Sequence, residues 1–288
     1  MFASCRPADR RTYIMPLVFA CSASHTPGIT AWPEAAPKKQ RDAVLGAFNK
    51  LKEGLKDSGA EVLVVIAPEH FANFFLNNMP AFCIGVGTQH MGPVEPWLNI
   101  ERKSISGDSA FANTLLQGCY DEGFEISFSN ELDFDHGVVL PINFLIPDGR
   151  IPIVPIIFNA LCDPMPSPKR CFEFGRVIRE VADKNEKKVA IIGTGGLSHW
   201  PGEAEHGIIN ERFDKQFLHD IIQNDVDILL NYSHDKISSS GTGGHEIRSW
   251  IAVAGAATMW KPELLTYQAI NAWATGCGFV SYHCPNNF

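Results

Sequence analysis

Three histidines of the sequence, His25, His70 and His199, follow short apolar runs that predict strands. Imidazole binds transition metals and exchanges protons near neutral pH, so these side chains are candidates for metal binding and acid–base catalysis. In a parallel sheet, ligands gather beyond the carboxyl ends of the strands. We therefore expect the three imidazoles to lie near one another, although they are far apart in the chain. The preceding runs are, in this order, Leu17–Ser22, Glu61–Ala67 and Lys188–Ile192.

A carboxylate would complete a metal site. Two imidazoles and one carboxylate on one face of a metal leave open positions for a substrate and oxygen, which is typical of non-haem Fe(II) oxygenases. The candidates are Glu69, Asp133, Asp135 and Glu246. Glu246 is favoured because it begins a predicted helix directly after a Gly-rich turn, Gly241–Gly244, where the backbone can approach a ligand closely. A glutamate in a first helical turn also stabilises the helix dipole, so this simpler interpretation stays open.

Other catalytic motifs are incomplete in this sequence. Gly193–Gly196 (GTGG) matches neither a dinucleotide-binding fingerprint nor a phosphate-binding loop, which disfavours nucleotide binding. His245 and Glu246 begin like the HExxH motif of zinc proteases, but Ser249 stands where the second histidine is needed. Histidines follow Ser24 and Ser198, yet the sequence has no GxSxG nucleophile elbow.

The elements that must position these residues alternate along the chain. Ala81–Val86 and Ile151–Phe158 also predict strands, and Pro152 and Pro155 favour an edge or irregular position for the second of them. Alternation of strands and helices predicts an α/β fold, a single domain with a mostly parallel central sheet and helices on both faces. The predicted helices are Lys38–Ser58, Ser109–Glu122, Lys169–Lys184, Glu211–Leu230 and Glu246–Met259.

Composition and charge narrow the class of protein. The chain has 24 Lys and Arg against 32 Asp and Glu, a net charge of −8, which disfavours nucleic acid as a partner. It has no apolar run of about 18 residues, so no membrane span is expected. Residues 1–14 lack the apolar segment of a secretory signal and are interpreted as a tail, with Met15 as an alternative start and 15–288 as the domain. The eight cysteines form no CxxC motif, which predicts reduced thiols and a cytoplasmic protein.

Five motifs occur together: SHTP at Ser24–Pro27, PEH at Pro68–His70, DHG at Asp135–Gly137, GTGGLSH at Gly193–His199 and GGHE at Gly243–Glu246. In this combination the chain resembles the catalytic subunit of class III extradiol ring-cleaving dioxygenases. That family includes the protocatechuate 4,5-dioxygenase β-subunit and 2,3-dihydroxyphenylpropionate dioxygenase. The resemblance spans about Pro16 to Cys284. It implies an enzyme of aromatic compound catabolism that inserts both atoms of O₂ into a catechol-type ring and opens it.

The resemblance also implies a role for each matched residue. His25, His70 and Glu246 match the ligands of Fe(II), the cofactor of the family. His199 matches the acid–base histidine of the active site. His136, in the DHG motif, matches a second active-site histidine near the substrate.

Several points stay open at this stage. An aminophenol ring-cleaving dioxygenase is the nearest alternative, and a zinc-dependent hydrolase is another, because the same ligands bind Zn²⁺ well. A non-catalytic binding module has no need to keep ligands and an acid–base group together. Expected partners are a catechol-type small molecule and O₂, a second copy of the chain and, as in some relatives, a small companion subunit. Asp135 and Asn73 are candidates to orient the histidines.

Overall fold

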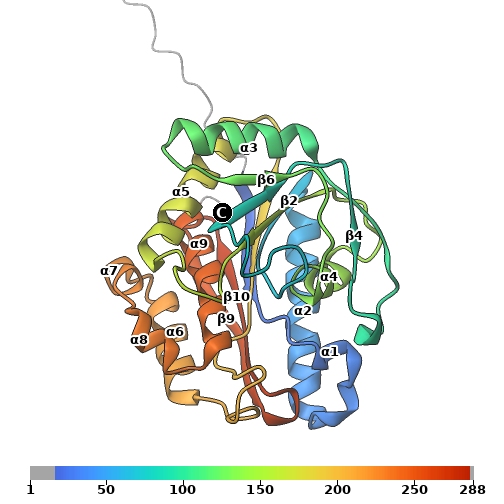
Figure 1. The fold of residues 1–288 in the computed structure, drawn as a ribbon, viewed down its shortest axis with the longest axis vertical. Coiled ribbons are helices and arrows are strands. Elements are labelled where there is room, and N and C mark those ends of the chain that lie inside the picture. The colour runs from blue at the N-terminus through green and yellow to red at the C-terminus, as the bar shows by residue number, and fades with distance from the viewer. Residues whose placement is uncertain (1–16, 286–288) are drawn as a thin grey trace, which may run out of the picture.

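An eight-stranded sheet forms the centre of this computed structural model, which describes residues 17–285 (Figure 1). The predicted tail over 1–14 and the alternative start at Met15 lie outside the described residues. In sheet order the strands are β6 (Ser127–Ser129), β3 (Phe82–Gly85), β7 (Ile153–Phe158), β2 (Val62–Pro68), β8 (Val189–Thr194), β1 (Leu17–Ala23), β10 (Thr275–His283) and β9 (Lys261–Ile270).

Parallel strands make up the middle of this sheet. The strands β7, β2, β8 and β1 are parallel neighbours. The strand β3 is antiparallel to β7, and β10 is antiparallel to both β1 and β9. The predicted single α/β domain with a mostly parallel central sheet is therefore confirmed.

The strand β2 shows why both faces of the sheet are covered. Val64 and Ile66 belong to one buried core, whereas Val65 and Ala67 belong to the core on the opposite face. Successive side chains of a strand point to opposite faces, so a strand buried on both sides needs a continuous apolar run. That run is the feature from which the strand was predicted.

Helices cover the two faces in separate groups (Figure 1). One core contains side chains of α3 (Ser109–Asp121), α5 (Pro168–Asp183), α6 (Glu211–Ile222) and α9 (Ile247–Ala256). The other contains side chains of α2 (Lys38–Ser58) and α4 (His136–Leu145). Shorter elements are α1 (Gly28–Ala31), α7 (Val226–Leu230), α8 (His234–Ser238), the ribbon of β4 (Gln89–Gly92) and β5 (Lys103–Ser106), and 3₁₀ turns over Pro33–Ala35, Pro96–Leu98, Thr242–Glu246 and Asn271–Trp273.

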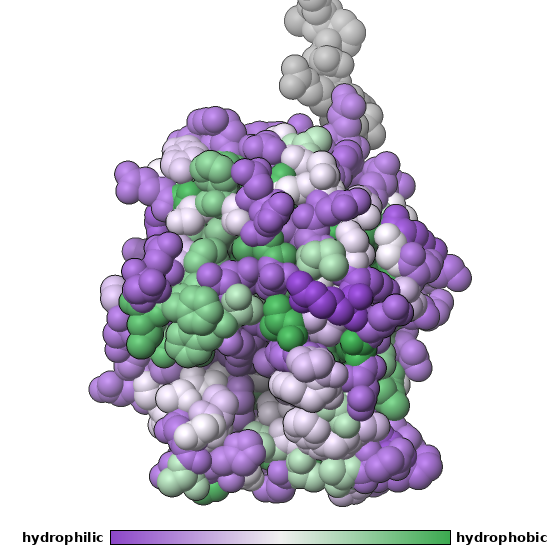
Figure 2. Space-filling model, turned by 45° about the vertical axis from the view of Figure 1, so that its right-hand side comes forward, coloured by the Kyte–Doolittle hydropathy of each residue, from purple (hydrophilic) through white to green (hydrophobic). Residues whose placement is uncertain are grey.

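Within residues 17–285, none of the helices has both the length and the apolar character required to cross a membrane. On the face shown in Figure 2, hydrophobic areas are interrupted by hydrophilic ones. The seven cysteines in the described part of the chain are free thiols.

The strand β7 lies inside the sheet, between β3 and β2, so the predicted edge position is wrong. Its ladder with β3 ends at the pair Ile84–Ile156. The next residue of β3 is Gly85, where a Cβ would lie only 2.5 Å from Cγ of Pro155. Because Pro155 stands where the pairing with β3 stops, its missing N–H removes no bond of that ladder. Pro152 lies just before the strand begins.

The predicted helix Glu211–Leu230 is two helices, α6 and α7, so its continuity was wrongly predicted. Asn224 between them adopts a left-handed backbone conformation with φ 52°. Asp225 then accepts a hydrogen bond from the N–H of Ile228 and caps α7. The apolar spacing continues across the break because both helices face the same core.

The predicted helix Glu246–Met259 is shorter than expected at both ends. Glu246 ends a 3₁₀ turn and is the N-cap residue of α9, which runs over Ile247–Ala256. The C-terminal hairpin of β9 and β10 was not predicted, because β9 is only partly buried and has no continuous apolar run.

Candidate active site

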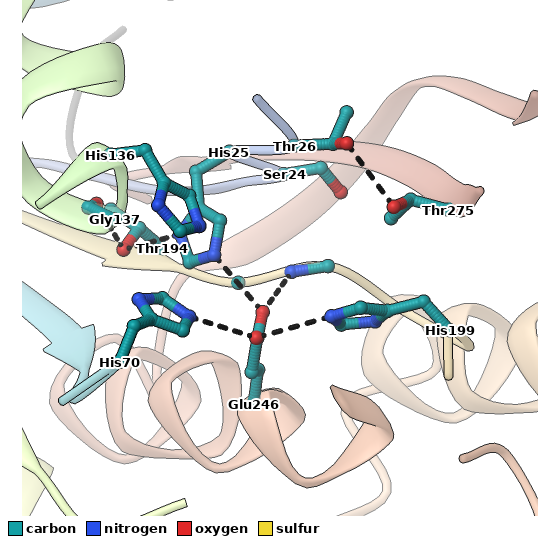
Figure 3. A network of polar contacts seen from close by, with 12 residues as sticks. Ser24, His25, Thr26, His70, His136, Gly137, Thr194, His199, Glu246 and Thr275 are labelled. Atoms are coloured by element: carbon teal, nitrogen blue, oxygen red, sulfur yellow. Dashed lines mark hydrogen bonds and ion pairs between the residues drawn. The ribbon is translucent and has the colours of Figure 1, made fainter. Parts of the chain in front are cut away.

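The carboxyl ends of three adjacent strands bring the predicted histidines together (Figure 3). His25 follows β1, His70 follows β2, and His199 lies in the loop after β8. Since the sheet order is β2-β8-β1, these strand ends are immediate neighbours. The convergence expected from the three post-strand positions is therefore present in the structure.

Glu246 stands between these three imidazoles (Figure 3). Its Oε1 lies 3.2 Å from Nε2 of His70 and 3.2 Å from Nε2 of His199. Its Oε2 lies 3.1 Å from Nε2 of His25 and accepts the N–H of Gly196 at 2.6 Å. The carboxylate is buried. One carboxylate at the start of α9 thus faces three imidazole nitrogens from three different strand ends.

Hydrogen bonds at the far nitrogen set the tautomers of His25 and His70. The Thr194 hydroxyl donates to the carbonyl of Gly137 at 2.8 Å, so it accepts from Nδ1 of His25 at 3.2 Å. Asp135 accepts from Nδ1 of His70 at 3.1 Å. Because Nδ1 carries the proton in both neutral rings, Nε2 presents a lone pair toward Glu246.

His199 follows the same rule through the backbone. Its Nδ1 lies 2.9 Å from the carbonyl oxygen of Leu197, which can only accept a hydrogen bond. In the neutral ring the proton is therefore on Nδ1, and the lone pair on Nε2 faces Glu246.

These facing atoms form a set of acceptors without a proton among them. Three Nε2 lone pairs and a carboxylate within hydrogen-bond distance repel one another unless a positive charge lies among them. Protons or a metal ion can supply that charge, and imidazole nitrogen with carboxylate oxygen is a common donor set for divalent transition metals. The residues present therefore fit a metal cofactor.

The electrostatics of the cluster reflect the same need for positive charge. Burial disfavours charge on Glu246, but His199 and His25 hold the pKa of its carboxyl well below the usual range. Burial also opposes charge on His70, yet Asp135 and Glu246 together hold its pKa well above the usual value. For His25 burial dominates and lowers the pKa to about 4.

His136 begins α4 beside this cluster. The metal-binding atoms of His25, His70 and His136 lie within 4.8 Å of one another, so these three histidines form a second potential ligand group. The Nδ1 of His136 lies 2.6 Å from Oε1 of Glu95. Its ring stacks on that of His70, with centroids 4.3 Å apart and an interplanar angle of 25°.

Glycines leave room for the site side chains, which explains the glycine-rich motifs. A Cβ at Gly243 would lie 2.1 Å from Nε2 of His199, and one at Gly196 would lie 2.8 Å from Cε1 of the same ring. A Cβ at Gly137 would lie 3.1 Å from Cε1 of His70. These positions need glycine because of close approach rather than backbone conformation.

The other predicted carboxylates and Asn73 have different neighbours. Glu69 is buried and accepts the N–H groups of Ala72 and Asn73, which shapes the loop after His70. Asp133 pairs with Arg102. Both ends of the Asn73 side-chain amide bond to the backbone of Asp133. Of the two predicted orienting residues, Asp135 bonds to a site histidine, whereas the Asn73 amide holds the backbone of Asp133.

Two residues of the site were not predicted from the sequence. Thr194 orients His25, and Glu95 bonds to both the ring and the backbone N–H of His136. Thr194 stands within the GTGG motif, so its motif was a usable signal. Glu95 lies 41 positions before His136 in an irregular segment, and no local pattern marks it.

Comparisons with known proteins identify similar chains. Residues 19–278 match the LigB family, described as the catalytic LigB subunit of aromatic ring-opening dioxygenase. A 2,3-dihydroxyphenylpropionate/2,3-dihydroxicinnamic acid 1,2-dioxygenase of Photorhabdus laumondii is 29% identical over 308 residues, covering 90% of this chain and 95% of that protein. An enzyme of the same name from a Rhodococcus species is 24% identical, covering 93% and 98% of the two chains.

A solved structure shows a similar fold. The crystal structure of an uncharacterized protein from Escherichia coli K12 covers 92% of this chain and 99% of its own, with a TM-score of 0.60 and 14% identity. At this identity the likeness concerns the fold alone.

Proposed function

We propose that this chain holds Fe(II) with His25, His70 and Glu246. It belongs to the LigB family of catalytic subunits of aromatic ring-opening dioxygenases. It is thus an extradiol ring-cleaving dioxygenase that acts on a catechol-type substrate with O₂. The observation that carries this proposal is the single buried carboxylate faced by imidazole lone pairs. Two imidazoles and one carboxylate are the usual ligand set of non-haem Fe(II) oxygenases.

Ring orientation supports Glu246 rather than His136 as the third ligand. Imidazole binds a metal through a lone pair that lies in the plane of the ring. The rings of His70 and His136 are stacked at 25°, so their lone pairs run nearly side by side instead of meeting at one point. The ring of His25 is at 81° to that of His70, an arrangement in which the two ring planes can meet.

The reaction supports iron over zinc. Fe(II) bound there would supply redox chemistry and open coordination positions for the catechol and O₂. Zn²⁺ has no redox chemistry, so the zinc hydrolase alternative does not fit a dioxygenase family. The relatives are named as dioxygenases of 2,3-dihydroxylated compounds, so neither the zinc hydrolase nor the aminophenol dioxygenase is favoured.

His199 is proposed as the acid–base residue. Its Nδ1–H is held by the carbonyl of Leu197, so Nε2 is the atom that exchanges protons. In this role Nε2 takes a proton from a catechol hydroxyl and later returns it during ring opening. The ordinary pKa of imidazole suits both directions, and Glu246 raises the pKa of His199 against the effect of burial.

His136 is proposed to contact the substrate. Glu95 accepts from its Nδ1 at 2.6 Å, so Nε2 of the neutral ring is an acceptor, and the ring lies beside those of His25 and His70. The ring of His136 also lies edge-on to that of His25 at a centroid distance of 5.2 Å. An acceptor at this place can hold a substrate hydroxyl beside the metal ligands.

Oxygen uptake with a panel of catechols tests the proposed function. The similar curated enzymes make 2,3-dihydroxyphenylpropionate the first substrate to try. Protein loaded with Fe(II) without oxygen should then consume O₂ and form a yellow ring-opened product, while protein loaded with Zn(II) should not. Equal O₂ uptake in both preparations would contradict the assignment of iron. Uptake with 2-aminophenol but with none of the catechols would support the aminophenol alternative instead.

A further inference from the structure

A single peptide group lies between the His199 imidazole and a buried carboxylate outside the metal cluster. Its carbonyl, on Leu197, accepts from Nδ1 of His199 at 2.9 Å. Its N–H, on Ser198, donates to Oδ1 of Asp214 at 2.8 Å. The two groups belong to one planar, resonance-coupled amide. We infer that Asp214 is a positioning residue for His199 and acts on it through this amide.

Asp214 is surrounded by donors. It lies in the first turn of α6 and is fully buried. Its Oδ2 accepts from the Ser198 hydroxyl at 2.9 Å and from the Tyr267 hydroxyl at 2.8 Å. Burial raises the pKa of Asp214 to about 6, against the effect of these donors. The Ser198 N–H and the two hydroxyls all donate to its two oxygens, an arrangement that fits an ionised carboxylate, which only accepts hydrogen bonds. A negative charge therefore stands at the N–H end of the peptide.

The backbone of this segment is already held without the carboxylate. Leu197 N–H donates to the carbonyl of Gly276 at 3.0 Å, and Gly276 N–H donates to the carbonyl of Ser198 at 3.1 Å. Strand β10 also leaves space for Asp214, since a Cβ at Gly276 would lie 2.0 Å from its Oδ2. Burying a carboxylate is costly, and anchoring a segment that β10 already anchors does not account for it.

The charge of Asp214 acts on His199 as follows. A carboxylate that accepts the amide N–H polarises the amide, and hydrogen bonds in series strengthen one another. The Leu197 carbonyl thereby becomes a stronger acceptor for Nδ1–H of His199. That bond holds the ring in one orientation and keeps the lone pair on Nε2, where the proposed proton transfer takes place. The inference rests on the proposed role of His199 in catalysis.

Asp214→Asn tests the charge with little change of shape. The asparagine oxygen can still accept from Ser198 N–H, whereas its amide must donate to the hydroxyls of Ser198 and Tyr267, which lose Oδ2 as an acceptor. The control variants therefore remove each of these hydroxyls in turn. Ser198→Ala is the matched control, because it removes a hydroxyl contact to Asp214 but keeps the peptide. Tyr267→Phe is a second control that also leaves the peptide and the charge in place.

Two measurements on these variants separate a positioning role from a structural one. For Asp214→Asn we expect kcat to fall by about 10-fold or more with KM changed less than about 3-fold, a part of the 10²–10⁴-fold that a positioned acid–base group supplies. In NMR spectra of the Zn(II)-loaded protein, the Nδ1 proton of His199, assigned by its loss in His199→Asn, should move upfield in Asp214→Asn. It should stay in place in Ser198→Ala and Tyr267→Phe.

The outcomes are distinct. An unmoved Nδ1 resonance and an unchanged kcat in Asp214→Asn would overturn the inference, whatever the activity of the wild type. Equal losses of kcat and equal shifts in all three variants would also overturn it, because they would indicate loosening of the segment. A moved resonance in Asp214→Asn with full activity in His199→Asn would support the peptide link but contradict the proposed function.

Discussion

Two regions of the molecule contain a histidine beside a glutamate, and they differ in almost everything else. At the carboxyl end of β1 and β2, His25 and His70 face Glu246 at 3.1 and 3.2 Å, with the carboxylate side chain only 5% exposed. In the C-terminal hairpin, His283 and Glu263 are closer, at 2.8 Å, but are 55% and 57% exposed. The shorter contact is the one without a sign of function.

The difference lies in what surrounds each pair. Glu263 and His283 line a cavity of about 400 Å³ together with charged and apolar side chains, and water can solvate both partners. Glu246 is screened from water and faces three imidazoles whose outer nitrogens are each held by another group. Exposed ion pairs contribute little to stability. Buried imidazoles with fixed tautomers, whose lone pairs face a carboxylate, instead create a site that requires a cation. Burial and outer partners, rather than distance, distinguish the site.

Glu246→Gln should have the largest effect. The amide removes the negative charge and adds N–H donors to the metal cluster, so metal affinity should fall more than about 100-fold, because changes to groups that only orient ligands already cost about 10–100-fold. The metal content of the purified protein, measured by elemental analysis, checks this. The matched change at the exposed pair, Glu263→Gln, should leave metal content unchanged. Full metal content in Glu246→Gln would remove this residue from the ligand set.

His199→Asn should abolish most turnover but keep the metal. Loss of a positioned acid–base group costs about 10²–10⁴-fold in rate, while His25, His70 and Glu246 remain. Steady-state O₂ uptake and metal analysis on the same sample separate the two effects. Loss of the metal would instead make His199 a ligand, and near-normal turnover would contradict its acid–base role.

Gly243→Ala should lower kcat by about 100-fold, since small misplacement of a catalytic group has effects of that size. The new Cβ would stand 2.1 Å from Nε2 of His199, so the ring must move. Gly46→Ala in α2 is the control, because a Cβ there meets nothing within 4 Å and alanine favours a helix. The control should be as active as the wild type. Equal kcat in both variants would show that the close approach is unimportant.

His283→Gln should have the smallest effect. The side chain is exposed and its ion pair is screened by solvent, so the free energy of unfolding should change by less than about 0.5 kcal/mol. Urea denaturation monitored by fluorescence and O₂ uptake should both match the wild type. A large loss of activity would mean that the exposed pair takes part in function, which would remove the contrast between the two regions.

The elements that could be predicted are those whose sequence has a continuous or periodic apolar pattern. The strand β2 and the helix α2 were predicted from their apolar patterns because each has a fixed relation to a core. The hairpin β9–β10 and the interior position of β7 were not, since pairing between strands is a tertiary interaction and Pro155 is compatible with the interior only where a ladder ends.

The sequence by itself determined the histidines at the ends of strands, the glycines that let the chain approach them, and an apolar pattern that requires an α/β sheet. Only the tertiary structure decided how the parts of the site meet: Glu246 reaches His70 across 176 positions, and Glu95, which no local motif marks, bonds to the ring of His136. The physical reason is that residue type and spacing set local conformation. Lone-pair direction, burial and outer hydrogen bonds depend on which distant segments pack together.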